Sequence, residues 1–274
     1  MIFEKFKLSD KYPFLNDYNS EAIVEIYIQE DPVNQNGSSP RKGMVVCPGS
    51  GYRQCARIES EPVASKLLAM GFNVFVITYS CDPVRHPAQI LEVAALYDLI
   101  AKNKDEWNTD VERTGIMGFS AGGHLAAHYS NKYNCSEIMS KFESVHKPYT
   151  TILGYPVISA DPEIRHEGSF MYLLGHVPSK DEIDAFSCER MVSDDTPPTF
   201  IWHTVEDKSV PVQNSLRYAE ALSNHGIDYT LHIYPYGPHG LSTVDNMSVA
   251  DVPEKVAYGH DWLRQLEKWV ELIY

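Results

Sequence analysis

A serine flanked by glycines constrains the fold of this chain more than any other short stretch. Residues 118–122 have the pattern G-x-S-x-G, with Ser120 at the centre. The residues before it, 115–117, are small or apolar like the end of a buried strand, and residues 125–129 favour a helix. A sharp turn from strand to helix would expose the serine hydroxyl and direct the first helical N–H groups towards it. The pentapeptide is common, so its meaning depends on what the rest of the chain supplies.

Composition narrows the class of protein. The chain has 274 residues, 43% hydrophobic and 22% charged, which suffices for one sizeable core, and we expect a single domain over residues 1–274. A formal net charge of −14 argues against nucleic acid or an anionic membrane as a partner. Five cysteines without a C-x-x-C pair predict free thiols. No stretch resembles a signal peptide or a membrane span, so we expect a cytoplasmic protein.

Strand and helix patterns alternate along the chain. Strands are predicted at residues 21–29, 44–47, 72–79, 113–119, 150–157, 199–203 and 228–234, and helices at 59–70, 87–102, 212–224 and 253–274. Most of these strands are apolar throughout, which predicts an α/β fold with a mostly parallel central sheet covered by helices on both faces. Residues 159–198, after the sixth strand of the fold, break the rhythm and are either a small cap or lid or a surface excursion.

Candidate partners for the serine lie where strands end, the edge at which such sheets carry their sites. His239 lies in a turn of glycine and proline after the last strand. Asp207 follows the strand at 199–203 and is favoured as the acid, with Glu206 as the alternative. A serine needs such a base, and the base needs an acid that orients it. The order Ser120, Asp207, His239 is that of α/β-hydrolases.

Two further sets of residues complete the predicted site. The backbone N–H groups of Ala121 and of Gly51, with Ser50 as second choice, are predicted to bind a developing oxyanion. Side chains beside these loops could contact a substrate, because an aromatic ring can stack on a sugar face. They are Tyr52, Arg53 and Tyr236, and they could equally form the sides of the cleft.

Five stretches together resemble the α/β-hydrolase esterases of the acetyl-xylan esterase-like or sugar hydrolase-like (BD-FAE-like) family. They are residues 47–52, 61–80, 118–126, 195–207 and 234–240. The resemblance implies a serine hydrolase that cleaves short-chain carboxylic esters through an acyl-enzyme, including acetyl esters of sugars or oligosaccharides. Family members usually have three glycines where this chain has Gly49-Ser50-Gly51, so the Ser50 side chain would narrow the acyl pocket.

Other functions remain open at this stage. A peptidase or amidase could use the same triad, and a binding scaffold could keep the fold without the chemistry. His124 and His128 have the i, i+4 spacing of zinc ligands, but no glutamate lies between them and no third ligand is evident, so no metal is expected. No nucleotide-binding motif is present, so no cofactor is expected either. The expected partner is a small ester, and a homo-oligomer is left open.

Overall fold

The computed structural model describes residues 1–30, 39–248 and 251–274. Within these ranges eight strands form one sheet in the order β1-β2-β4-β3-β5-β6-β7-β8. The strands are β1 (Ile2–Lys7), β2 (Ile23–Ile28), β3 (Arg41–Cys47), β4 (Asn73–Thr78), β5 (Thr109–Phe119), β6 (Thr151–Gly154), β7 (Thr199–Thr204) and β8 (Tyr229–Tyr234). β2 is antiparallel to both β1 and β4, and the other neighbours are parallel. The mostly parallel sheet predicted from the sequence is confirmed.

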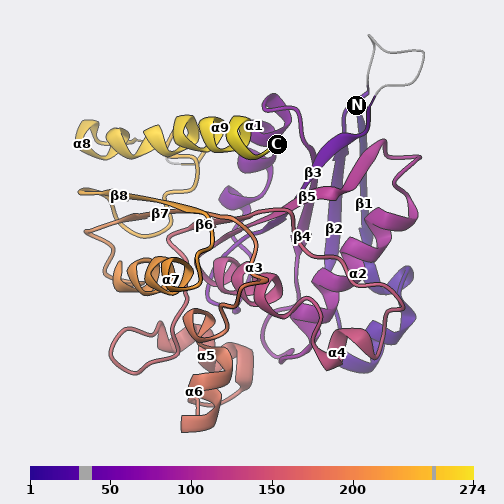
Figure 1. Cartoon of the computed structure of the whole chain (residues 1–274), viewed down its shortest axis with the longest axis horizontal. Helices are drawn as coiled ribbons and strands as arrows, with labels where there is room; N and C mark the ends of the chain where they lie inside the picture. The colour runs from indigo at the N-terminus through magenta and orange to yellow at the C-terminus, as the bar shows by residue number, and fades with distance from the viewer. Residues whose placement is uncertain (31–38, 249–250) are drawn as a thin grey trace.

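Helices cover both faces of the sheet and enclose two separate cores. On one face lie α2 (Ala88–Lys102), α3 (Ser120–Lys132) and α7 (Gln213–Asn224), and on the other lie α1 (Glu61–Ala69) and α9 (Asp261–Ile273) (Figure 1). Neighbouring residues of β3 point to opposite cores, Val45 to the first and Met44 to the second. A strand buried on both faces needs apolar residues at every position, which explains its unbroken hydrophobic run.

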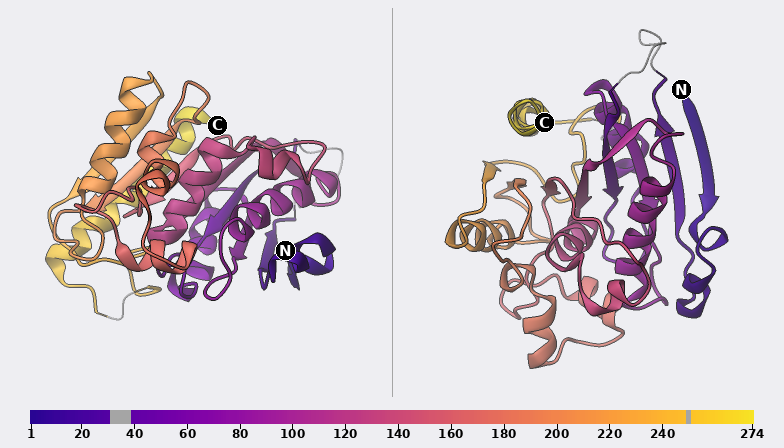
Figure 2. Two further views of the ribbon diagram at one scale, coloured as in Figure 1. Left: turned by 90° about the horizontal axis from the view of Figure 1, so that it is seen from below. Right: turned by 45° about the vertical axis from the view of Figure 1, so that its right-hand side comes forward.

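Two parts of the chain differ from the sequence prediction. β1 was not predicted, and it forms one edge of the sheet, opposite β8 (Figure 2), with its first four residues exposed. An exposed edge strand has no apolar stripe by which to recognise it. The long helix predicted at 253–274 was wrong in its first part. It is divided into α8 (Glu254–Ala257), a 3₁₀ turn at Tyr258–His260, and α9, and the turn contains Gly259, a poor helix former.

Residues 159–198 contain α5 (Glu167–Leu174) and α6 (Lys180–Phe186), which lie beyond α3 and α7 on the same side of the sheet (Figure 1). Phe170, Leu173 and Phe186 are part of the core that α2 and α3 form. The side chain of Asn214 on α7 accepts hydrogen bonds from the N–H groups of Ile158 and Ser159 and donates to the carbonyl of Ile164. The segment is therefore joined to the body of the molecule by apolar packing and by a buried amide.

Three histidines contact this segment through Phe170 and Phe186: the buried His124 and His128 of α3, and the half-buried His86 before α2. The ring of His86 stacks on that of His128, with centroids 5.5 Å apart, and His124 lies 5.7 Å from His128. Burial lowers the pKa of His86 and of His124 to about 4 and holds the pKa of His128 well below its usual range. Protonating these histidines therefore costs more free energy in the folded protein than in the unfolded chain.

For this reason the three histidines are expected to lower the free energy of unfolding on mild acidification, whereas buried Glu92, whose pKa is raised to about 7, acts in the opposite direction. Each histidine has a folded pKa below its unfolded value of about 6.5, so the unfolded chain binds more protons at these sites once the pH drops below that value. Each proton lowers the free energy of unfolding by up to about 1.4 kcal/mol per pH unit. In urea unfolding between pH 7.5 and 5, acidification should destabilise His86→Phe, which keeps a ring against His128, less than it destabilises the wild type. An equal effect of pH on both proteins would contradict the explanation.

Candidate active site

Ser120 lies at the turn where β5 ends and α3 begins. Its φ of 51° is in the left-handed region, a strained conformation for serine that is common at functional turns. The turn is tight enough to exclude side chains at two flanking positions. A Cβ on Gly118 would come within 2.1 Å of the carbonyl oxygen of Gly122, and a Cβ on Gly122 within 2.1 Å of that of Cys47. Glycine is therefore required at both ends of the pentapeptide, as the motif predicts.

The three residues predicted as nucleophile, acid and base lie together. His239 Nε2 is 2.7 Å from Ser120 Oγ, and His239 Nδ1 is 2.6 Å from Asp207 Oδ2. They come from the ends of β5, β7 and β8, which are brought to one edge by the parallel sheet. An imidazole placed between a hydroxyl and a carboxylate can accept the hydroxyl proton while the carboxylate fixes its tautomer.

The surroundings of Asp207 keep its carboxylate ionised. Its Oδ1 accepts the N–H groups of Ser209 and Val210, both at 2.9 Å, and its Oδ2 also lies 3.2 Å from Nε2 of His203. Burial opposes ionisation of Asp207, but the hydrogen bonds from His203 and His239 outweigh it and hold the pKa of Asp207 below its usual range. A permanent anion therefore faces the imidazole.

Two residues near Asp207, Glu206 and His203, lie in different surroundings, one at the surface and one in the core. Glu206, the alternative acid, accepts the N–H of Gly237 at 3.1 Å and is exposed, so it holds the loop that leads to His239. His203 is fully buried on β7, with Nδ1 2.8 Å from Ser215 Oγ and Nε2 3.0 Å from the carbonyl oxygen of Val210. No sequence signal separates His203 from the other residues of an apolar strand.

The predicted oxyanion loop is packed directly against the serine. A Cβ on Gly49 would lie 2.7 Å from Ser120 Cβ. Ser50, Gly51 and Tyr52 have φ of 111°, 70° and 60°, three left-handed residues in succession. The N–H of Gly49 donates to Glu59 Oε2 at 2.6 Å and is therefore engaged. The next amides of the loop, those of Ser50 and Gly51, stay the predicted donors together with Ala121.

The three residues predicted to contact a substrate differ in how far their side chains are exposed to solvent. Tyr52 is 1% exposed, and its hydroxyl lies 2.9 Å from Nδ1 of His124, so its ring lies beneath the loop and not beside a ligand. Arg53 is exposed. Tyr236 is 44% exposed, and Nζ of Lys255 lies 5.2 Å from its ring centroid. Of these three side chains, only those of Arg53 and Tyr236 are accessible to a molecule from solvent.

His166, at the start of α5, lies over the predicted oxyanion loop, which the sequence did not reveal. Its Cε1 is 3.6 Å from the position of a Cβ on Gly51, and its Nδ1 accepts the N–H of Ser169 at 3.3 Å. Burial and the nearby His239 lower the pKa of His166. With eleven histidines in the chain and an irregular segment around it, nothing in the sequence distinguishes this one. The segment 159–198 therefore reaches the candidate site.

The zinc alternative finds no support in the geometry of His124. Its Nδ1 meets the Tyr52 hydroxyl and its Nε2 lies 2.9 Å from the carbonyl oxygen of Phe186, so both ring nitrogens are engaged. Across residues 1–30, 39–248 and 251–274, no group of three or more histidine, cysteine, aspartate or glutamate side chains could hold a metal ion.

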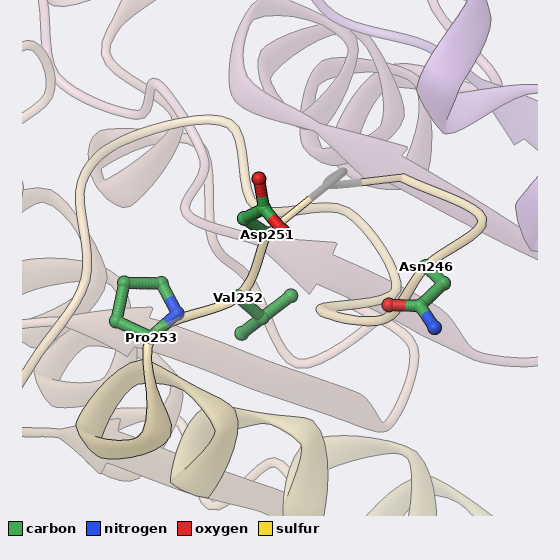
Figure 3. A pocket seen from close by; sticks show the side chains of 4 residues that line it. All are labelled: Asn246, Asp251, Val252 and Pro253. Atoms are coloured by element: carbon green, nitrogen blue, oxygen red, sulfur yellow. The ribbon is translucent and has the colours of Figure 1, made fainter.

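A hollow of about 370 Å³ lies in the loop before α8 (Figure 3). Asn246, Asp251, Val252 and Pro253 line it, and none belongs to the candidate site. In the described ranges, no helix has the length and apolar character needed to cross a lipid bilayer.

Comparison with known proteins places the chain in a family. Residues 26–222 match the sequence model of the BD-FAE family. A solved structure, an acetyl ester-xyloside bifunctional hydrolase from Caldicellulosiruptor lactoaceticus, is 37% identical with a TM-score of 0.79, over 92% of this chain and 88% of that one. It supports the α/β-hydrolase fold.

Two curated relatives are similar in sequence to this chain, but the similarity covers less than half of their own length. The acetylxylan esterase of Xylanibacter ruminicola is 34% identical over 215 residues, which is 77% of this chain and 42% of the relative. Endo-1,4-beta-xylanase B of Butyrivibrio fibrisolvens is 34% identical over 239 residues, which is 84% of this chain and 37% of the relative. The chain thus spans about two fifths of the length of these relatives. With its serine turn at the end of β5 and a family match over residues 26–222, this chain belongs to the BD-FAE family of α/β-hydrolases.

Proposed function

We propose that the protein is a serine esterase that hydrolyses short-chain carboxylic esters, among them acetyl esters of sugars, through an acyl-enzyme. The observation that carries the proposal is the position of His239, which lies within hydrogen-bond distance of both Ser120 and Asp207. The acetyl ester-xyloside hydrolase and the acetylxylan esterase among the relatives support acetyl esters as the substrate class.

The proposed reaction has two halves. Ser120 Oγ attacks the ester carbonyl while His239 Nε2 accepts its proton, and the imidazolium returns that proton to the departing alcohol. A water molecule then attacks the acyl-enzyme while His239 accepts one of its protons, and the imidazolium returns that proton to Ser120 Oγ as the bond to the acyl carbon breaks and the carboxylic acid leaves. Asp207 binds Nδ1–H throughout and stabilises the imidazolium. The N–H groups of Ala121 and of Gly51 or Ser50 bind the oxyanion, and loss of one such donor typically costs ~100- to 1,000-fold in rate.

We also infer that residues 159–198 cover the site as a fixed wall. His166 lies over Gly51, and the segment is tied to α7 by Asn214 and to the main core by Phe170 and Phe186. A segment that must open for every substrate would have few buried apolar contacts. This arrangement favours a permanent side of the cleft over a lid that moves.

Short acyl chains are expected to react fastest. The His166 ring lies against the oxyanion loop, and Ser50 adds a side chain to that loop, which would leave little room for a long acyl group. We expect kcat/KM for p-nitrophenyl acetate to exceed that for p-nitrophenyl octanoate by about tenfold or more, the scale on which a pocket rejects extra methylenes. Equal or higher activity on the octanoate ester would contradict a narrow acyl pocket.

The substrate class itself can be tested on acetylated xylo-oligosaccharides. We expect acetate release that is abolished in Ser120→Ala, with aminoacyl-arylamides cleaved far more slowly. Comparable cleavage of the arylamides would instead favour a peptidase or amidase on the same three residues. Absence of both activities, together with failure of a fluorophosphonate to label Ser120 in folded protein, would favour a binding scaffold.

A further inference from the structure

Glu59 is a buried carboxylate next to the site that the proposed reaction does not use. It ends the 3₁₀ turn Arg57–Glu59 before α1 and is 2% exposed. Its Oε2 accepts the N–H of Gly49 and its Oε1 accepts the hydroxyl of Tyr155, both at 2.6 Å. Both oxygens act as acceptors, which is the pattern of an ionised carboxylate. Its two partners are neutral groups.

Keeping this charge buried has a cost that calls for an explanation. Burial raises the pKa of Glu59, and the hydrogen bonds from Tyr155 and Gly49 oppose that shift without cancelling it. A buried anion held by neutral donors is less stable than an apolar residue of the same size would be. Residues of this kind are concentrated at functional sites.

One hydrogen bond of Glu59 acts on the oxyanion loop. A Cβ on Gly49 would lie 3.1 Å from Glu59 Oε2 and 2.7 Å from Ser120 Cβ, so the carboxylate, the loop and the serine are in successive contact. By engaging the Gly49 N–H, the carboxylate fixes the Pro48–Gly49 peptide plane, which comes just before the planes that carry the N–H groups of Ser50 and Gly51. The directions of the next two amides depend on that plane.

The other hydrogen bond acts on the loop of the base. The Tyr155 hydroxyl that donates to Glu59 also accepts the N–H of Ser242 at 2.8 Å, and the Tyr155 ring meets the His239 ring edge to face at 5.0 Å. Ser242 lies three residues after His239, and its Oγ donates at 2.6 Å to the carbonyl of Ile58, the residue before Glu59. The base loop is thereby connected to Glu59 through Tyr155 and through the backbone.

We propose that Glu59 is a positioning residue that holds the oxyanion loop and the base loop in fixed relation through Gly49 and Tyr155. It touches no reacting atom. The inference rests on the proposed esterase function, because it assigns a role to Glu59 only within that reaction.

Loss of this link should lower kcat rather than raise KM. The oxyanion and the imidazolium exist in the transition state and not in the bound ester, so misplaced loops weaken transition-state binding specifically. We expect Glu59→Gln and Tyr155→Phe each to lower kcat for p-nitrophenyl acetate by about 10- to 100-fold, the scale of one hydrogen bond to a charged group. KM should stay within about twofold.

The double variant and a matched control sharpen the test. Since both substitutions break the same link, the double variant should lose no more than about twofold beyond the worse single variant. Glu92→Gln is the control, because Glu92 is equally buried and bonded by Ser20 and Ser80 but lies on α2 outside the site. It should keep kcat within about twofold of the wild type.

Each result decides the proposal. Every kcat is divided by the fraction of active sites titrated with a fluorophosphonate, and folding is checked by circular dichroism and Tm. Full kcat per site in Glu59→Gln and Tyr155→Phe, even with a lowered Tm, overturns the positioning role and leaves the esterase proposal intact. A wild-type protein that neither hydrolyses the ester nor is labelled at Ser120 overturns the esterase proposal first. If Glu59→Gln does not fold, Tyr155→Phe decides from the other end of the link.

Discussion

Ser120→Ala is expected to abolish hydrolysis of p-nitrophenyl acetate, with kcat reduced by up to about a million-fold, as for removal of a serine nucleophile in other triads. The alanine offers no oxygen to attack the carbonyl, and His239 Nε2 loses the hydroxyl that lies 2.7 Å away. What activity remains would come from the oxyanion donors and from substrate binding alone. Steady-state assays at high enzyme concentration, with mass spectrometry after fluorophosphonate treatment, measure both losses.

Ser130→Ala is the matched control for this variant. Ser130 lies on the same helix, is fully buried, and its Oγ is 2.7 Å from that of Thr151. We expect this variant to lose some stability, about 1 kcal/mol for a buried hydrogen bond, while its kcat stays near the wild-type value. A Ser120→Ala protein that retains full activity would show that the nucleophile has been wrongly assigned.

Asp207→Asn is expected to lower kcat by about 10,000-fold, the effect of the same change in another serine hydrolase triad. An amide that presents its NH₂ group to His239 would favour the tautomer with the proton on Nε2, which cannot accept a proton from Ser120. An amide also carries no charge with which to stabilise the imidazolium. The rate should be measured across pH 6 to 9, so that a shift of the profile is not mistaken for a loss of rate.

Glu206→Gln separates the two acidic residues of this loop. Glu206 bonds the N–H of Gly237 and makes no contact with the imidazole, so its amide should lower kcat by no more than a few-fold, about the effect of one exposed hydrogen bond. The opposite order, with Glu206→Gln inactive and Asp207→Asn active, would identify Glu206 as the acid. Similar losses in both would mean that the geometry of the loop, and not one carboxylate, governs the rate.

The sequence predicts most of this fold because its informative strands are buried. β3, β4 and β7 are apolar on both faces, and each is followed by a turn and a helical pattern. β1 has no such pattern, since its outward positions are exposed and it pairs with β2 alone. Local composition identifies elements that fill the core, whereas an edge strand depends on its hydrogen bonds to the neighbouring strand, which local composition does not show.

The candidate site was predictable to a similar degree. Ser120, Asp207 and His239 could be found because each follows a strand, in a known order. Glu59 and Tyr155 could not, because their partners lie 10 and 87 residues away in the chain. Tyr52 was predicted to contact a substrate but is buried, and the cause is the local backbone conformation. Its φ of 60° turns the chain so that the ring packs inward against Tyr79 rather than towards solvent.

The hydrogen bonds behind Asp207 have a single direction. The carbonyl of Val210 and the carboxylate can only accept, so His203 Nε2 carries a proton, and in the neutral imidazole Nδ1 accepts one from the Ser215 hydroxyl. Two chains of hydrogen bonds therefore run towards Asp207. One leads from the Ser215 hydroxyl through His203, and the other from the Ser120 hydroxyl through His239. Helix α7 thus supplies, through Ser215, the hydroxyl that meets His203 Nδ1, and His203 in turn holds the Asp207 oxygen that binds His239 Nδ1.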